Sequence, residues 1–180
     1  GASRPGNRPV MQPVVLCILD GVGLGRPDDG NAVWAADTPI FDRLTRGPLH
    51  CSLAAHGTAV GLPSDSDMGN SEVGHNAIGA GRTFAQGASL VDDALESGTA
   101  FTGETWPWLI STGTLHLVGL LSDGNVHSHV RHLHSLLRQA ARSGVKRVRV
   151  HFLTDGRDVG ERTALEYVEP LERLLQELSP

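Results

Sequence analysis

Residue types that take part in chemistry are concentrated in one segment, SDSDMGNSEVGHNAIGAGR, residues 64–82. At its centre lies Ser71, a candidate nucleophile. The nucleophile elbow of α/β-hydrolases has the pattern G-x-S-x-G, whereas here the second glycine, Gly74, comes one residue too late. A serine outside such an elbow needs another way to lose its proton, and coordination to a divalent metal ion is one. Ser71 is therefore a candidate for metal-assisted nucleophilic chemistry.

A short helix over residues 71–78 would offer two roles for Ser71. The free amide hydrogens at the start of such a helix favour a phosphate or an oxyanion beside the serine. Serine is also a preferred N-cap residue, and Glu72 suits a first helical turn. On the local pattern alone, capping by Ser71 is the favoured interpretation and catalysis is the second.

Acidic side chains follow three apolar runs. The runs are VVLCILD (14–20), TLHLVGLLSDG (114–124) and VRVHFLTDG (148–156), and they lead to Asp20-Gly21, Asp123-Gly124 and Asp155-Gly156. Each run predicts a buried strand that brings its acid to the carboxyl end of a sheet, where ligands bind in α/β proteins. Asp-Gly is also a common turn dipeptide, so any single pair is more often a turn than a site.

Asp20 is best interpreted as a carboxylate held at a strand end, where a hard cation could use it. The glycines of DGVGLG do not form a dinucleotide-binding fingerprint, because Arg26 stands where the third glycine is needed. A single carboxylate binds a metal ion only weakly. Further ligands are therefore expected from elsewhere in the fold.

The second and third Asp-Gly pairs are followed by residues suited to anion binding. His127 can donate to a phosphate or act as an acid. Arg157 has the planar fork that fits phosphate or carboxylate, and Asp158 can accept a hydrogen bond from a hydroxyl group. The plainer alternative for Arg157 and Asp158 is a surface ion pair. The nearby His132 and His134 are interpreted as solvated or packing residues rather than as zinc ligands.

Helical patterns separate the predicted strands. They cover DTPIFDRLTRG (37–47), SLVDDALESG (89–98), residues 130–142 and the segment from about 162 onward. The last pattern contains Pro170, which should kink the helix or divide it in two. Strands that alternate with helices predict an α/β fold with mainly parallel sheets and flanking helices.

The overall composition excludes several classes of function. The net charge is −5 and no basic stripe is present, so a nucleic-acid partner is not expected. No apolar run is long enough to cross a bilayer, and the first residues lack the apolar core of a signal peptide. The two cysteines, Cys17 and Cys51, indicate neither a disulfide framework nor a zinc site. We therefore expect a cytoplasmic protein that binds small molecules with local groups and has no membrane partner.

Five segments together resemble the cofactor-independent phosphoglycerate mutases of the alkaline phosphatase superfamily. They are LDGVG (19–23), MGNSEVGHNAIGAGR (68–82), QGASLVDDALESG (86–98), LHLVGLLSDGNVHSH (115–129) and DGRDV (155–159). The second and fifth segments are specific, unlike a single Asp-Gly pair. The resemblance implies an isomerase that interconverts 3-phosphoglycerate and 2-phosphoglycerate in glycolysis and gluconeogenesis, without a diffusible bisphosphate cofactor.

The resemblance also implies a role for each candidate residue. Asp20 and Ser71 are implied to be ligands of one of two manganese ions, and Ser71 is also the nucleophile that becomes phosphoserine. His127, Arg157 and Asp158 are implied to bind the phosphoglycerate substrate. In the implied mechanism, Ser71 takes the phosphoryl group, the trapped glycerate reorients, and the group returns to its other hydroxyl. Such a site must be closed and poor in water, or the phosphoserine would hydrolyse.

Members of this family are much longer than 180 residues, and a transferase domain is inserted into their phosphatase domain. We expect residues 1–12 to be a disordered tail, 13–85 the N-terminal part of an alkaline-phosphatase-like domain, and 86–180 the first part of the transferase domain. The remaining metal ligands would then lie outside this chain. We expect little or no mutase activity from these 180 residues alone, and a monomer for the full-length enzyme.

Two other functions fit parts of the pattern. A metal-dependent phosphatase or sulfatase of the same superfamily would share Asp20 and a hydroxyl nucleophile, but it should lack the features around His127 and Arg157. A non-catalytic binding fragment would keep the fold without the metal. Metal content separates this second alternative from an active enzyme.

Overall fold

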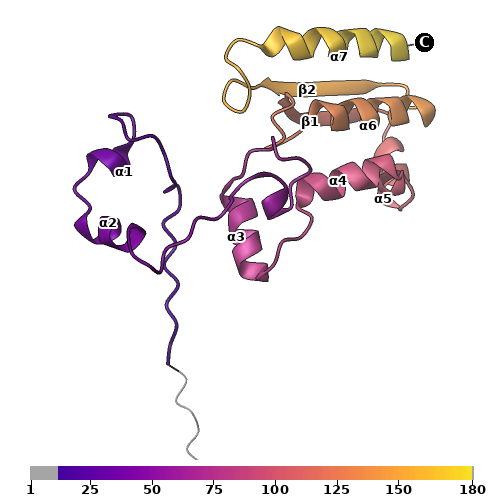
Figure 1. The fold of residues 1–180 in the computed structure, drawn as a ribbon. Coiled ribbons are helices and arrows are strands. Elements are labelled where there is room, and N and C mark those ends of the chain that lie inside the picture. Colours follow the sequence, from indigo (N-terminus) through magenta and orange to yellow (C-terminus); the bar gives the residue numbers. More distant parts are fainter. Residues whose placement is uncertain (1–11, 180) are drawn as a thin grey trace, which may run out of the picture. The chain divides into compact units, whose positions relative to one another are not determined.

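The computed structural model describes residues 12–179 (Figure 1). The chain divides into two compact units, Gly1–Cys51 and Ser52–Pro180. All but the last residue of the tail predicted at 1–12 lies outside the described residues. Every described helix is too short or too polar to span a membrane.

Two short helices lie in the first unit. Helix α1 (Ala32–Ala35) begins after Asn31, whose side-chain oxygen accepts hydrogen bonds from two backbone amides of the helix. Helix α2 (Pro39–Thr45) begins after Thr38 and has proline in its first turn, where no amide donor is needed. The helix predicted within residues 37–47 is therefore confirmed.

The strand predicted at residues 14–20 is wrong, because this segment forms no sheet. Its apolar side chains are exposed, with 93% of Val14 accessible to solvent. A β-strand is stable only beside a hydrogen-bonded partner, and none of the described residues pairs with this segment. Asp20 therefore lies in a turn, closed by a hydrogen bond from the Val22 amide to the Leu19 carbonyl at 3.2 Å.

The second unit contains a parallel sheet of two strands. Strand β1 (Leu115–Leu121) and strand β2 (Val148–Thr154) pair in register along their whole length. Helix α6 (Val130–Arg142) connects them, which makes a β-α-β arrangement. Both predicted strands, the helix predicted between them and their parallel direction are confirmed.

Helix α7 (Ala164–Leu178) packs with α6 and β1 around one core. The buried residues of this core are Leu121 of β1, Leu137 of α6, and Leu171 and Leu174 of α7. Pro170 lies inside α7, which continues past it as one helix, so of the two predicted outcomes the division is wrong and the kink stays a prediction. A proline removes one backbone hydrogen bond from a helix interior, and burial of the leucine that follows it compensates for this loss.

The remaining elements of the second unit are η1 (Gly57–Val60), α3 (Ser71–Ala80), α4 (Gly87–Glu96), η2 (Thr99–Phe101) and α5 (Thr105–Ile110). Helix α4 begins before the predicted Ser89, whose hydroxyl instead donates to the Gly61 carbonyl at 3.1 Å. Gly61 has a φ of 87°, and a Cβ atom there would lie 1.7 Å from the Phe84 carbonyl oxygen. Only glycine fits where these two parts of the chain meet.

Candidate functional site

Two loops meet at the carboxyl ends of β1 and β2. Leu121 lies beside Thr154 in the sheet, so the next residues along the strands, Ser122 and Asp155, come side by side. The Ser122 hydroxyl donates a hydrogen bond to Asp155 Oδ2 at 2.6 Å, and both residues are buried. The second and third Asp-Gly pairs therefore lie at one edge of the sheet, as predicted.

Asp155 organises the loop that carries two of the predicted substrate-binding residues. Its Oδ1 atom accepts hydrogen bonds from the backbone amides of Arg157 at 2.9 Å and Asp158 at 3.0 Å. The Ser122 hydroxyl and these amides hold the pKa of Asp155 below its usual value, because each stabilises the charged form. Both carboxylate oxygens are thus engaged within the protein.

The three predicted substrate-binding residues lie together at this edge. His127 Nε2 is 4.0 Å from Asp158 Oδ2, and Arg157 Nε is 3.7 Å from Asp158 Oδ1. The Asp158 side chain is only 3% exposed, whereas the His127 and Arg157 side chains are 60% and 80% exposed. A buried carboxylate is thus flanked by two exposed side chains of basic type.

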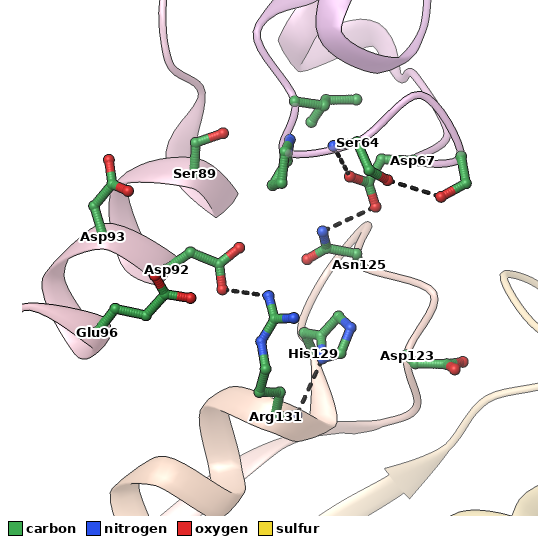
Figure 2. A pocket seen from close by; sticks show the side chains of 13 residues that line it. Ser64, Asp67, Ser89, Asp92, Asp93, Glu96, Asp123, Asn125, His129 and Arg131 are labelled. Carbon is green, nitrogen blue, oxygen red and sulfur yellow. Dashed lines mark hydrogen bonds and ion pairs between the residues drawn. The ribbon is translucent and has the colours of Figure 1, made fainter.

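The missing side chain of Gly124 lets the two loops approach. A Cβ atom at this position would lie 2.6 Å from the Cβ atom of Asp158. The next residue, Asn125, has a φ of 56°, and its side-chain amide donates to Asp67 Oδ1 at 3.0 Å. This hydrogen bond joins the loop after β1 to the segment that leads to Ser71 (Figure 2).

One oxygen of the buried Asp158 carboxylate has no donor. Asp158 Oδ1 has no hydrogen-bond partner among the described residues, since Arg157 Nε at 3.7 Å is too distant. A buried acceptor without a donor costs about 1–3 kcal/mol. The atom is closed to solvent, so a ligand hydroxyl could supply the missing hydrogen bond only if the loops around it move.

Ser71 is the first residue of α3, which confirms the helix predicted at residues 71–78. The helix is capped by Asn70, whose side-chain oxygen accepts a hydrogen bond from the Val73 amide at 3.0 Å. The interpretation of Ser71 as the cap is therefore wrong, because the residue before it has that role. Val73 is buried in a small apolar cluster with Val60, which fixes this turn, while Ser71 itself is exposed.

The two predicted metal ligands are divided between the units. Asp20 belongs to the first unit and Ser71 to the second. In the part of the chain that the structure describes, no three His, Cys, Asp or Glu side chains are grouped so that they could hold a metal ion. A hard divalent cation such as manganese is held by several oxygen ligands. The described residues therefore show no complete manganese site by themselves.

A polar pocket of about 750 Å³ lies between α4, the loop at 62–67 and the loop after β1 (Figure 2). Its charged and basic lining residues are Asp67, Asp92, Asp93, Glu96, Asp123, His129 and Arg131. Arg131 is already paired with Asp92 at 2.6 Å, and His132 contacts the same carboxylate at 2.8 Å. Partial burial raises the pKa of Asp92, and the bonds from Arg131 and His132 lower it by more. The pKa of Asp92 therefore lies below its usual value. The pocket is therefore acidic and unsuited to an anionic ligand.

Sequence reasoning missed Ser122 and Asn125. Ser122 precedes one Asp-Gly pair as Thr154 precedes another, so a repeated hydroxyl-Asp-Gly pattern was the available signal. Asn125 follows Gly124 in the loop after β1, and asparagine is one of the few residues that adopt a left-handed backbone readily. Neither pattern predicts which residue the side chain of Ser122 or of Asn125 contacts.

The family profile described as "BPG-independent PGAM N-terminus" matches residues 91–180, which is half of the chain. This chain belongs to the BPG-independent phosphoglycerate mutase family. The resemblance predicted from five short segments is thereby confirmed. The roles implied for Asp20, Ser71, His127, Arg157 and Asp158 within this mutase family stay predictions.

Curated mutases of the family are similar to nearly the whole chain. The 2,3-bisphosphoglycerate-independent phosphoglycerate mutase of Trypanosoma brucei brucei is 54% identical over 171 residues, which cover 92% of this chain and 31% of the relative. That of Zea mays is 53% identical over 175 residues, covering 94% and 31%. A Leishmania mexicana phosphoglycerate mutase, in crystal structures at low cobalt concentration, matches with a TM-score of 0.81 and 50% identity, over 89% of this chain and 30% of that one. The chain thus spans just under a third of the length of these mutases.

Proposed function

We propose that the complete protein interconverts 3-phosphoglycerate and 2-phosphoglycerate, with Ser71 as the phosphoryl acceptor. The observation that carries this proposal is the group of His127, Arg157 and buried Asp158 at the carboxyl end of the sheet. The family supplies the reaction, since the similar full-length proteins are phosphoglycerate mutases. This chain spans 31% of those proteins, so the activity is proposed for the complete protein rather than for residues 1–180.

The groups of phosphoglycerate match the side chains at this edge. The substrate carries a phosphate, a carboxylate and a hydroxyl. Exposed Arg157 and His127 are proposed to donate hydrogen bonds to its anionic oxygens. Asp158 is proposed to accept from the hydroxyl, after a movement of the surrounding loops that uncovers its Oδ1 atom, which lacks a donor among the described residues. The two basic side chains are thus proposed to meet the anionic groups of the substrate, and Asp158 is proposed to meet its hydroxyl group.

Ser71 is proposed to take and then return the phosphoryl group. Its Oγ attacks the phosphorus of 3-phosphoglycerate while the bond to the C3 oxygen breaks, and the serine proton ends on that oxygen. The C2 hydroxyl of the retained glycerate then attacks the phosphoserine, its proton returns to Ser71, and 2-phosphoglycerate results. The amides at the start of α3 favour the anionic group beside the serine. No diffusible bisphosphate is needed, because glycerate stays bound between the two transfers.

The complete site is proposed to bind two manganese ions, with Asp20 and Ser71 among the ligands of one. Oxygen ligands suit such cations. The other ligands must come from beyond the described residues, which contain no group of three ligating side chains. A phosphoglycerate mutase of the family has crystal structures at low cobalt concentration, which supports a divalent metal.

The domain division belongs to the same proposal. Residues 13–85 are assigned to a phosphatase domain and residues 86–180 to an inserted transferase domain; the family match, which begins at residue 91, supports this boundary. A metal-dependent phosphatase is a weaker alternative, because it has no use for the group around Asp158. A non-catalytic binding role is the alternative for residues 1–180 alone. The monomeric state and the cytoplasmic location stay predictions.

Replacement of Ser71 tests the proposal. Ser71→Ala in the complete protein should lower the rate of 2-phosphoglycerate formation, without added bisphosphate, by about 10³-fold or more, as loss of a nucleophile does. Ser66→Ala, in an exposed loop nearby, is the control and should retain activity. Substantial mutase activity of Ser71→Ala would refute the proposal. Release of inorganic phosphate by the unmodified protein, without interconversion, would favour the phosphatase alternative instead.

A further inference from the structure

We infer that Ser122 and Asp155 are positioning residues for substrate binding, and that they act through Arg157 and Asp158. This inference rests on the proposed function, because Arg157 and Asp158 are its proposed substrate contacts. The sequence left Asp155 open to two interpretations, a turn residue or an acid that itself meets a ligand. The geometry separates them.

Asp155 is directed into the protein. It is 8% exposed, and Ser122 beside it is fully buried. Its Oδ2 atom accepts from the Ser122 hydroxyl, and its Oδ1 atom accepts from two backbone amides. Three internal donors therefore engage the carboxylate, and a ligand would have to displace them to reach it.

The two amides that Asp155 holds belong to Arg157 and Asp158. An aspartate that accepts from amides two and three residues further on forms an Asx turn, which sets the direction of the backbone there. This direction sends the Arg157 side chain to the surface and the Asp158 side chain back into the protein. Ser122 anchors Asp155 to the end of β1, so the neighbouring strand holds the turn in place.

Ser122 also fixes the loop that carries His127. The Ser122 carbonyl accepts a hydrogen bond from the Val130 amide at 2.7 Å, at the start of α6. Between these two residues lie Gly124, which packs against Asp158, and His127, whose ring nitrogen is 4.0 Å from the Asp158 carboxylate. Ser122 is thus hydrogen-bonded to both loops, through its hydroxyl to Asp155 and through its backbone carbonyl to Val130.

Three substitutions in the complete protein separate positioning from charge. Asp155→Ala removes the acceptor for three donors and should raise KM for 3-phosphoglycerate by about 100-fold, as misplacement of binding groups by about 1 Å can do. Ser122→Ala removes one donor and should raise KM by about 10-fold. Asp155→Asn keeps Oδ1 as acceptor for both amides, and the Ser122 hydroxyl can turn to accept from the new amide group. Its KM should therefore rise by less than about 3-fold.

KM is the informative quantity, because partial unfolding lowers the apparent kcat and leaves the KM of the folded molecules unchanged. Val168→Ala is the control, since Val168 packs against the core formed by β1, α6 and α7 and is neither Ser122 nor Asp155 nor a partner in the hydrogen bonds between them and the loops. It should destabilise the protein without changing KM. If Asp155→Asn raises KM as much as Asp155→Ala, the charge itself matters and the inference is overturned. An unchanged KM in Ser122→Ala overturns it as well, even where Asp155→Ala does not fold.

Amide hydrogen exchange tests the inference without relying on activity. In Ser122→Ala, the amides of Arg157 and Asp158 should exchange at least about 10-fold faster than in Val168→Ala. Equal exchange in the two variants would overturn the positioning role. If the unmodified protein does not interconvert phosphoglycerates while these amides respond as expected, the proposed function fails and the positioning of the loop stands.

Discussion

The same kind of sequence forms different structures in the two units of this chain. An apolar run followed by Asp-Gly occurs once in the first unit and twice in the second, and only the latter two form strands. In the second unit, β1 and β2 pair with each other and pack against α6 and α7. In the first unit, none of residues 12–51 is buried. An apolar run therefore becomes a parallel strand only where a neighbour pairs with it and a helix covers it.

The largest contrast is expected between leucines of the two units. Leu171→Ala removes a side chain that is 2% exposed in the core, and it should lower the free energy of unfolding by about 2–5 kcal/mol. Leu16→Ala removes one that is 69% exposed in the first unit, and it should change this free energy by less than about 0.5 kcal/mol. Urea denaturation of chain 1–180 measures both. Equal losses would show that the first unit has a core of its own.

Two glycines with a left-handed backbone extend the contrast. Gly61→Ala should lower the free energy of unfolding by about 1–3 kcal/mol for overpacking against the Phe84 carbonyl, and by about 1–2 kcal/mol more for its φ of 87°. Gly21 has a φ of 78° and no atom within 4 Å of an added Cβ, so only the strain of the left-handed backbone applies. Gly21→Ala should therefore lower the free energy of unfolding by no more than about 1–2 kcal/mol. Thermal unfolding followed by circular dichroism compares them. Equal losses of unfolding free energy in the two variants would mean that the close contact between Gly61 and the Phe84 carbonyl does not limit the residue at position 61.

Loss of the hydrogen bond between Asn125 and Asp67 is expected to have a smaller effect on the stability of the second unit. Asn125→Ala should lower the free energy of unfolding by about 0.5–1.5 kcal/mol for the lost hydrogen bond, and further because alanine disfavours a φ of 56°. Asn125→Gly loses the same bond without that strain. It should be the more stable of the two variants in urea denaturation. The reverse order would mean that the loop does not keep its left-handed turn in solution.

Acid titration is expected to give the smallest effect. Asp155 has a lowered pKa in the folded protein, so its contribution to stability is complete above the ordinary aspartate pKa of about 3.9. This contribution is lost as the pH falls through the lower, folded value. Asp155→Asn should therefore weaken the fall of the urea midpoint below about pH 4. The same acid dependence in both proteins would contradict the pKa shift.

Local patterns predicted the elements whose partners are near in the chain. The strands β1 and β2 and helix α6 form one continuous β-α-β segment; the apolar runs identified the strands, and the spacing of apolar residues identified the helix. The segment at 14–20 has the same local character but lacks a described partner, and no local pattern reports that. Similarly, Ser71 and Asn70 are both good caps, and only the backbone geometry shows which one accepts the bond.

The candidate site was predictable in its position and not in its contacts. Parallel strands bring their carboxyl ends to one edge, which placed the second and third Asp-Gly pairs together. The same rule failed for Asp20, because its strand does not form. The bond from Ser122 to Asp155 and the bond from Asn125 to Asp67 join residues far apart in sequence, and they depend on how the loops fold.

The close packing of Gly124 on Asp158 restricts how this site can be transferred or altered. Gly124 in the loop after β1 has no side chain where Asp158 of the loop after β2 occupies the space, so the two loops fit together only with glycine at this position. A DGRD loop grafted alone onto another strand would lack both this glycine and the serine that holds its first aspartate. For a protein engineer the two loops are a single cassette, and a change in one requires a matching change in the other.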